Sequence, residues 1–232
     1  MPLSRRKQWV RLPTDWIQEE LLKGFRWAKG RGADNVAGLL VLVVLAHYAD
    51  QETGIVRLTY DEIGTILQRS RAKISGGLKV LTEHGLLVRD GFGQSTYALA
   101  GFDPTRGWGK LPAQSLYKSD KGDTLRAFED FRLRNSAELD ALKLYLLLVA
   151  RRGNDTNLAN ITYDRIQEYS GIERVRIKRA ISMLVAEGLV HVERIPSSAS
   201  AYGIAQGYRL VGIDSHNHMG TRGRALEAEP PL

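Results

Sequence analysis

Hydrophobic residues follow the same succession of patterns in two parts of the chain. Each part opens with an apolar stretch of helical length, at residues 36–48 and 139–151. A short helix, a tight turn and a longer helix with apolar residues at every third or fourth position come next, followed by two strand-like segments. The pattern therefore predicts three helices and a β-hairpin in each part.

Local signals indicate where the shorter helices begin and end. Thr59, with Glu62 three residues later, predicts a capping box, and Thr162 can cap the corresponding helix although Arg165 has replaced the glutamate. These two helices are expected to stop near residues 67–68 and 170–171. The longer helices are expected over residues 71–84 and 174–187, each ended by a glycine.

The two parts are also similar in sequence. The hexapeptide LTYDEI at residues 58–63 returns as ITYDRI at residues 161–166, and the same offset of 103 holds without a gap from residue 36 to residue 90. Twelve of these 55 positions are identical, which indicates an internal duplication. A fainter echo, WVRLPTDWI from Trp9 and WGKLPAQSL from Trp108, predicts a strand-like leader before each copy.

The chain is accordingly expected to hold two similar domains. We predict a basic arm with a leader at residues 1–31, a first domain at 32–101 and a second domain at 136–213. Between them, residues 102–135 form a linker with the second leader and a bridging helix over residues 123–134. Residues 214–232 lack periodicity and are expected to be disordered.

Three helices followed by a hairpin, with a tight turn between the second and third helices, is the winged helix-turn-helix plan. The segments LTEHGLL at residues 81–87 and LVAEGLV at 184–190 are typical of its junction between third helix and hairpin. The chain resembles tandem winged-helix DNA-binding proteins, and its leaders are similar to those of plasmid replication initiators with two winged-helix domains. The resemblance covers about residues 9–101 and 108–213. The expected fold class is mainly α with small β-hairpin wings (α+β).

Charge points toward a polyanionic partner. The chain has 33 Lys and Arg against 26 Asp and Glu, a net charge of +7. Residues 1–31 hold eight basic and three acidic residues, a net +5. Arg5, Arg6 and Lys7 are therefore candidates for contact with DNA, and an ordinary solubilising surface is the alternative.

In this fold the third helix usually enters the major groove of DNA. Its inner face is expected to be apolar, as with Ile74 and Leu78, and its outer face and flanks hold the candidate DNA-binding residues. These candidates are Arg71, Lys73, Ser75, Gly76 and Lys79 in the first copy, and Arg174, Arg176, Lys178, Arg179 and Ser182 in the second. Arg176, Lys178 and Arg179 are the strongest candidates for base or phosphate contacts. Arg71 and Arg174 are expected to clamp phosphates, with an ion pair inside the domain as the alternative.

Some candidates keep two interpretations open. Gly76 and Gly77 each cost about 1 kcal/mol relative to alanine inside a helix, which fits either close approach to DNA or a second protein, or a frayed helix. Tyr60 and Tyr163 either reach a phosphate or lie at the edge of the core. Arg194 is expected to flank the long second wing.

Several function classes find no support in the sequence. The chain has no cysteine, which removes thiol chemistry and fits a reducing compartment such as the cytoplasm. Its most apolar run, residues 36–46, is shorter than the ~18 residues that a membrane span needs. No histidine or carboxylate cluster has metal-ligand spacing, and the Gly-Lys of GWGKL lacks the phosphate-loop context. We expect no enzyme activity, no metal and no cofactor.

The predicted partner is double-stranded DNA. The resemblance implies replication initiation or transcriptional control in a plasmid or other mobile element, with association to the nucleoid or plasmid. It also implies homodimer formation and contact with the replication or transcription machinery. Two alternatives stay open: a repressor unrelated to replication, and a tandem winged-helix subunit that binds protein in a chromosome-organising complex. The basic third helices favour DNA.

Overall fold

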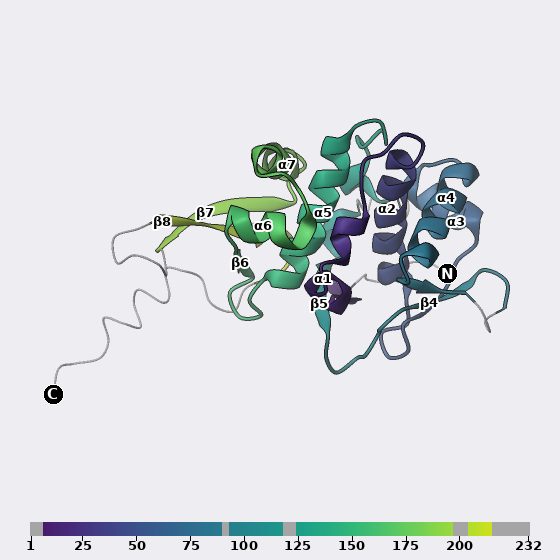
Figure 1. The fold of residues 1–232 in the computed structure, drawn as a ribbon. Helices are drawn as coiled ribbons and strands as arrows, with labels where there is room; N and C mark the ends of the chain where they lie inside the picture. The colour runs from purple at the N-terminus through teal and green to yellow at the C-terminus, as the bar shows by residue number, and fades with distance from the viewer. Residues whose placement is uncertain (1–6, 90–92, 118–123, 197–203, 215–232) are drawn as a thin grey trace.

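The structure is a computed structural model that describes residues 7–89, 93–117, 124–196 and 204–214. It is a mixed α+β fold with small antiparallel sheets (Figure 1). The first set of elements is α2 (Gly32–Tyr48), β2 (Ile55–Arg57), α3 (Tyr60–Leu67), α4 (Arg71–Glu83), β3 (Leu87–Val88) and β4 (Thr96–Leu99). The second set is α5 (Ser136–Arg151), β6 (Leu158–Asn160), α6 (Tyr163–Ser170), α7 (Arg174–Ala186), β7 (Val190–Pro196) and β8 (Ile204–Leu210).

The helices and their caps agree with the sequence signals. Thr59 and Glu62 form the capping box at the start of α3, and the Thr162 hydroxyl accepts a hydrogen bond from the Arg165 backbone at the start of α6. The third helices α4 and α7 end close to Gly85 and Gly188, whose φ angles of 68° and 66° are left-handed. Glycine adopts this conformation without strain, which explains its place after both helices.

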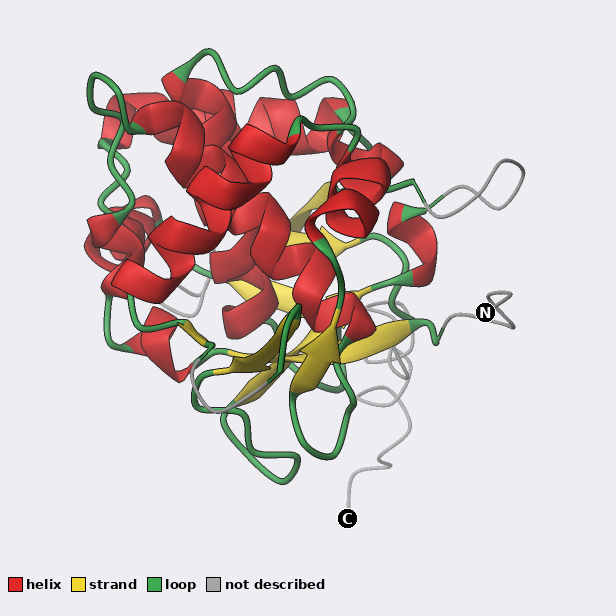
Figure 2. Cartoon of the chain, turned by 90° about the vertical axis from the view of Figure 1, so that its right-hand side faces the viewer, coloured by secondary structure: helices red, strands yellow, loops and turns green. Residues whose placement is uncertain are grey.

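Each set also contains a strand that the sequence patterns did not predict. The strands β2 and β6 pair with β4 and β8 and complete two three-stranded sheets, in the orders β2-β4-β3 and β6-β8-β7. Each added strand has only three residues, too few for alternation to be recognised in the sequence. Figure 2 shows most of the helices gathered on one side of the chain and the strands on the other.

The two leaders are strands, as predicted, and they pair with each other. β1 (Trp9–Pro13) and β5 (Trp108–Pro112) form an antiparallel ribbon in which Arg11 lies opposite Lys110, the matching position of the other leader. The indole rings of Trp9 and Trp108 stack with centroids 5.8 Å apart. The Lys110 ammonium lies 4.8 Å from the Trp9 ring and the Arg11 guanidinium 5.2 Å from the Trp108 ring. Such cation–π contacts stabilise the ribbon that joins the two halves.

The predicted bridging helix over residues 123–134 is wrong. Apart from the short turn η3 (Arg126–Phe128), residues 124–134 are irregular, with buried side chains at Leu125, Phe128, Phe131 and Leu133. The Leu125 backbone N–H donates to the carbonyl of Ile66 on α3, and Arg69 donates to the carbonyl of Glu129. Because these backbone groups bond to the first half, they do not bond along a helix of their own.

One hydrophobic cluster runs through both halves, with α2 and α5 packed against each other at its centre. The α5 helix is buried on all sides over residues 137–149, so that Glu138, Asp140 and Lys143 are buried as well. The Lys143 ammonium donates to the carbonyl of Phe25, which follows the short helices α1 (Asp15–Gln18) and η1 (Leu21–Gly24). The Phe25 ring in turn stacks on His84 with centroids 4.2 Å apart. The segment after β1 therefore connects the two halves.

The glycine pair of α4 has an explanation that neither interpretation of the sequence foresaw. A Cβ atom on Gly77 would lie 2.9 Å from the carbonyl carbon of Ala37, in the backbone of α2. A Cβ on Gly76 would lie 2.9 Å from the carboxylate carbon of Asp34. The close approach is thus to a helix of the same half, and the glycines let α4 cross α2 almost backbone to backbone.

We expect Gly77→Ala to destabilise the fold by about 1–3 kcal/mol, because the added methyl group meets the α2 backbone, which cannot rotate away. Gly76→Ala is the matched control, since there the methyl group meets only the flexible Asp34 side chain and gains the better helix propensity of alanine. Urea denaturation of both variants measures the difference. Equal stability of Gly77→Ala and wild type would contradict the close crossing.

Candidate nucleic-acid interface

The outward face of α7 carries a stripe of polar and cationic side chains. Lys178, Arg179 and Ser182 are all exposed, as predicted, while Ile177 and Leu184 are buried against the core. Within the described part of the chain, neither Lys178 nor Arg179 forms an ion pair. Two neighbouring cations on the outward face of α7 are thus available to an anionic partner.

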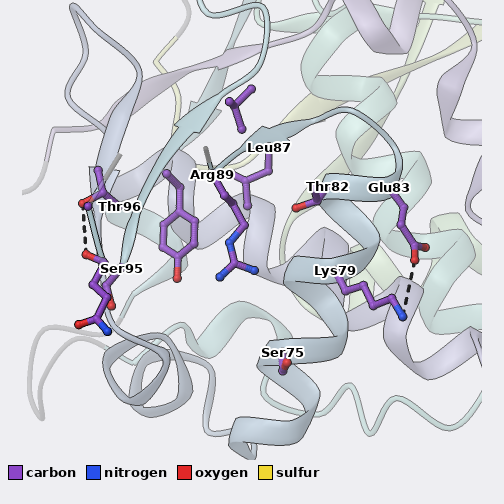
Figure 3. Close-up of a pocket in the computed structure, with 12 residues that line it drawn as sticks. Ser75, Lys79, Thr82, Glu83, Leu87, Arg89, Ser95 and Thr96 are labelled. Atoms are coloured by element: carbon purple, nitrogen blue, oxygen red, sulfur yellow. Dashed lines mark hydrogen bonds and ion pairs between the residues drawn. The ribbon is translucent and has the colours of Figure 1, made fainter. Parts of the chain in front are cut away.

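The corresponding face of α4 is less strongly charged. Ser75 and Lys79 are exposed, and the Lys79 ammonium lies 3.9 Å from the carboxylate of Glu83 one turn later. This face forms one wall of an open groove of about 870 Å³, with the β3–β4 hairpin as the other wall. Figure 3 shows Ser75, Lys79 and Thr82 on the helix, Ser95 and Thr96 on the hairpin, and Arg89 between them.

The same three side chains meet at the start of the third helix in both halves. Arg71 donates two hydrogen bonds to the Asp61 carboxylate, at 3.0 and 3.1 Å, and its guanidinium lies 5.5 Å from the Tyr60 ring. In the second half, Arg174 pairs with Asp164 and lies 5.8 Å from the Tyr163 ring.

We call each set a Tyr-Asp-Arg triad: Tyr60, Asp61 and Arg71, and Tyr163, Asp164 and Arg174. The arginines stay largely exposed, with 70% and 58% of their side chains accessible. Each arginine therefore forms the ion pair inside its domain that the sequence left as the alternative to a phosphate clamp. Each guanidinium nevertheless remains exposed to solvent. Both tyrosines are half-buried and pack against the core, in agreement with the core-edge interpretation.

Arg89 is a candidate that the sequence patterns did not single out. It follows β3 directly, its guanidinium lies 5.7 Å from the Tyr97 ring, and it donates to the Tyr60 hydroxyl at 3.2 Å. Burial raises the pKa of Tyr97, so this phenol stays neutral beneath the cation. The only signal in the sequence is the position of Arg89, at the boundary between a strand and a glycine-rich turn.

Arg176 is held by its own domain. Its Nε donates to the Asp140 carboxylate at 2.8 Å, and Asp140 is buried in α5. Lys73 occupies the matching position of α4, and its ammonium lies 3.0 Å from Asp34 on α2. These two cations join the third helix to the first helix of each half, so they are removed from the set of outward-facing candidates.

Gly76 also leaves that set, because it faces Asp34 on α2 and not the outer surface. Of the remaining candidates, Lys7 and Arg194 are exposed. Arg5 and Arg6 lie outside the described residues, and so do the tip of the predicted second wing and the predicted disordered tail beyond Asp214.

The two third helices lie on opposite sides of the central α2–α5 pair. Figure 1 shows α7 beyond α5 at one side and α4 beyond α2 at the other. Each third helix is fixed by its own first helix, and each is followed by its own hairpin. The arrangement offers two separate third helices with exposed cations on one shared hydrophobic core.

Other kinds of site are not evident in the described ranges. No group of three or more histidine and carboxylate side chains there could hold a metal ion. No helix in these ranges has both the length and the apolar character needed to cross a lipid bilayer. Comparisons with protein-family models, with curated proteins and with solved structures found no match.

The buried ammonium group of Lys143 predicts that the stability of the fold depends on pH. Burial lowers the pKa of Lys143 to about 8 from an ordinary value of 10.5. Between these two values the unfolded chain binds more protons than the folded chain, so stability should rise as the pH rises through this window.

Urea denaturation between pH 7.5 and 10.5 tests this expectation, with Lys143→Met as the comparison. The stability of wild type relative to this variant should increase with pH. Parallel pH profiles for the two proteins would show that Lys143 keeps its ordinary pKa.

Proposed function

We propose that the protein binds double-stranded DNA sequence-specifically through two winged helices that arose by internal duplication. The observation that carries the proposal is the exposed cationic face on both third helices, each beside a β-hairpin. Arg71 and Lys79 mark this face on α4, and Arg174, Lys178 and Arg179 mark it on α7. The proposed activity is binding, with no catalytic step and no cofactor.

The arrangement of elements supports the winged-helix part of the proposal. In both halves three helices precede a hairpin, and a short strand after the first helix pairs with the last strand of that hairpin. A basic third helix in such a fold is suited to the major groove. The two leaders pair with each other about the matching residues Arg11 and Lys110, which supports duplication of one ancestral unit.

The side chains divide by the contacts that they can make. Arg71 and Arg174 lie in the first turn of the third helices, and Arg89 follows β3. We assign these three arginines to phosphates, which fix register without reading sequence. Lys178 and Arg179 lie on the outer stripe, where arginine can pair with guanine O6 and N7. Since the two stripes differ in sequence, the DNA site need not be a palindrome.

The biological role follows from the resemblance alone. We propose replication initiation or transcriptional control in a plasmid or other mobile element. Directly repeated copies of the bound sequence in one replicon would favour initiation, and a single site at a promoter would favour regulation.

Binding selection from a random duplex library tests DNA reading. Wild type should enrich a two-part motif, and Lys178→Ala/Arg179→Ala should enrich only one part of it. Removing a cation that binds a phosphate should reduce the slope of log affinity against log salt by about one. Arg165→Ala, which removes an exposed cation on α6, is the control and should keep both parts.

Arg176→Ala is unsuitable for this test, because it would leave Asp140 buried without its partner, at a cost of about 3–5 kcal/mol in stability. If wild type enriches nothing and any binding is insensitive to salt, the DNA proposal fails. A protein partner, as in the chromosome-organising alternative, would then take its place.

The triads give a second test. Asp61→Asn and Asp164→Asn each remove a carboxylate that competes with phosphate for the arginine. We expect each variant to bind DNA roughly two- to fivefold more tightly at low salt, the range of an exposed ion pair. Glu52→Gln changes the net charge equally at the partner of Arg11 and is the control. An equal gain in all three variants would indicate a general charge effect and no clamp.

A further inference from the structure

The most exposed large apolar side chain in the described residues lies on a proposed reading helix. Val175, in the first turn of α7, has 84% of its surface accessible. The next most exposed, Val88 and Val185, reach 44%. Isolated apolar residues on a surface are ordinary. Val175 differs because it is almost fully exposed to solvent and the other exposed residues of α7 are mostly polar or cationic.

The position of Val175 matters more than its exposure. A helix brings residues four and seven positions apart to one face, so Val175 shares its stripe with Arg179 and Ser182, and Lys178 lies beside it. From Val175 to Ser182 the stripe is about 10 Å long, about three base-pair steps of DNA. In helix-turn-helix proteins, the N-terminal residues of the reading helix contact base edges. Val175 lies in that part of α7.

The edges of the bases in the major groove offer one apolar group, the 5-methyl group of thymine. The remaining groups are hydrogen-bond donors and acceptors, which a valine side chain cannot satisfy. Resting on the proposed function, we propose that Val175 contacts the 5-methyl group of a thymine and thereby specifies that base in the half-site bound by α7. Arg179 and Lys178 contact bases or phosphates further along the same groove.

The first half lacks an equivalent contact. Ala72 occupies the matching position of α4 and is exposed as well. Its single methyl group does not project from the helix as far as the two methyl groups of valine. Thymine specification at this position therefore belongs to the second half, and the two halves read different features of the DNA.

The test starts from the sequence that full-length wild type selects. Each thymine in the α7 half-site is replaced singly by deoxyuridine, which lacks only the 5-methyl group. At one position the replacement should weaken binding about fourfold, the factor expected for burial of one methyl group. Val175→Ala should weaken binding to the thymine site by a similar factor and bind the thymine and deoxyuridine sites equally.

Val185→Ala, which truncates the valine near the end of the same helix, is the matched control and should still discriminate thymine from deoxyuridine. Ala72→Val should create a new preference for thymine in the other half-site. Because both Val175 and Ala72 are exposed, these variants should fold like wild type, which thermal unfolding verifies.

The outcomes separate this proposal from the proposed function. If wild type selects a salt-dependent site but no deoxyuridine replacement matters, or if Val175→Ala keeps its discrimination, the thymine contact is overturned and DNA reading stands. A change in oligomeric state on Val175→Ala, with DNA affinity intact, would overturn it in favour of a protein contact. If wild type selects no site, both proposals fall.

Discussion

The close crossing of the first and third helices in each half is the constraint on which the rest of the molecule depends. Gly38 and Gly77 bring α2 and α4 together in the first half, and the matching buried residues of the second half, Ala141 and Ala180, are also small. In the first half, contact with the α2 backbone fixes the rotation of α4 about its own axis. In the second half, small buried side chains occupy the matching contact and fix the rotation of α7 in the same way. The identity of the side chains that face outward follows from that rotation.

A buried or half-buried carboxylate on the first helix complements each crossing, and its position differs between the halves. In the first half it is Asp34, which pairs with Lys73 and lies over Gly76. In the second half it is Asp140, nearer the middle of its helix, which pairs with Arg176. The position that matches Gly76 is therefore open in the second half, where Arg179 occupies it and is exposed. The displaced carboxylate thus explains why the second half has room for Arg179 on the outer face of α7.

Most of the helices could be predicted from the sequence because their signals are local. The capping box at Thr59 and the glycines after α4 and α7 depend on residues within one or two turns. The strands β2 and β6 could not be predicted, because pairing with distant strands defines them. Periodicity placed Lys178 and Arg179 on the outer face, but it could not show that Arg176 reaches Asp140, 36 residues away. The helix predicted over residues 123–134 was wrong for the same reason, because a long-range hydrogen bond from the Leu125 backbone to Ile66 on α3 determines the structure there.

The β1–β5 ribbon can form only late in the synthesis of the chain, because its two strands are far apart in the sequence. β1 leaves the ribosome before its partner strand, which follows about a hundred residues later, a delay of about 5–20 s at ordinary translation rates. During that interval the first half can assemble its helices and its sheet, whereas Trp9 and Arg11 have no ribbon to join. β1 therefore remains without its partner strand until the ribosome has synthesised β5.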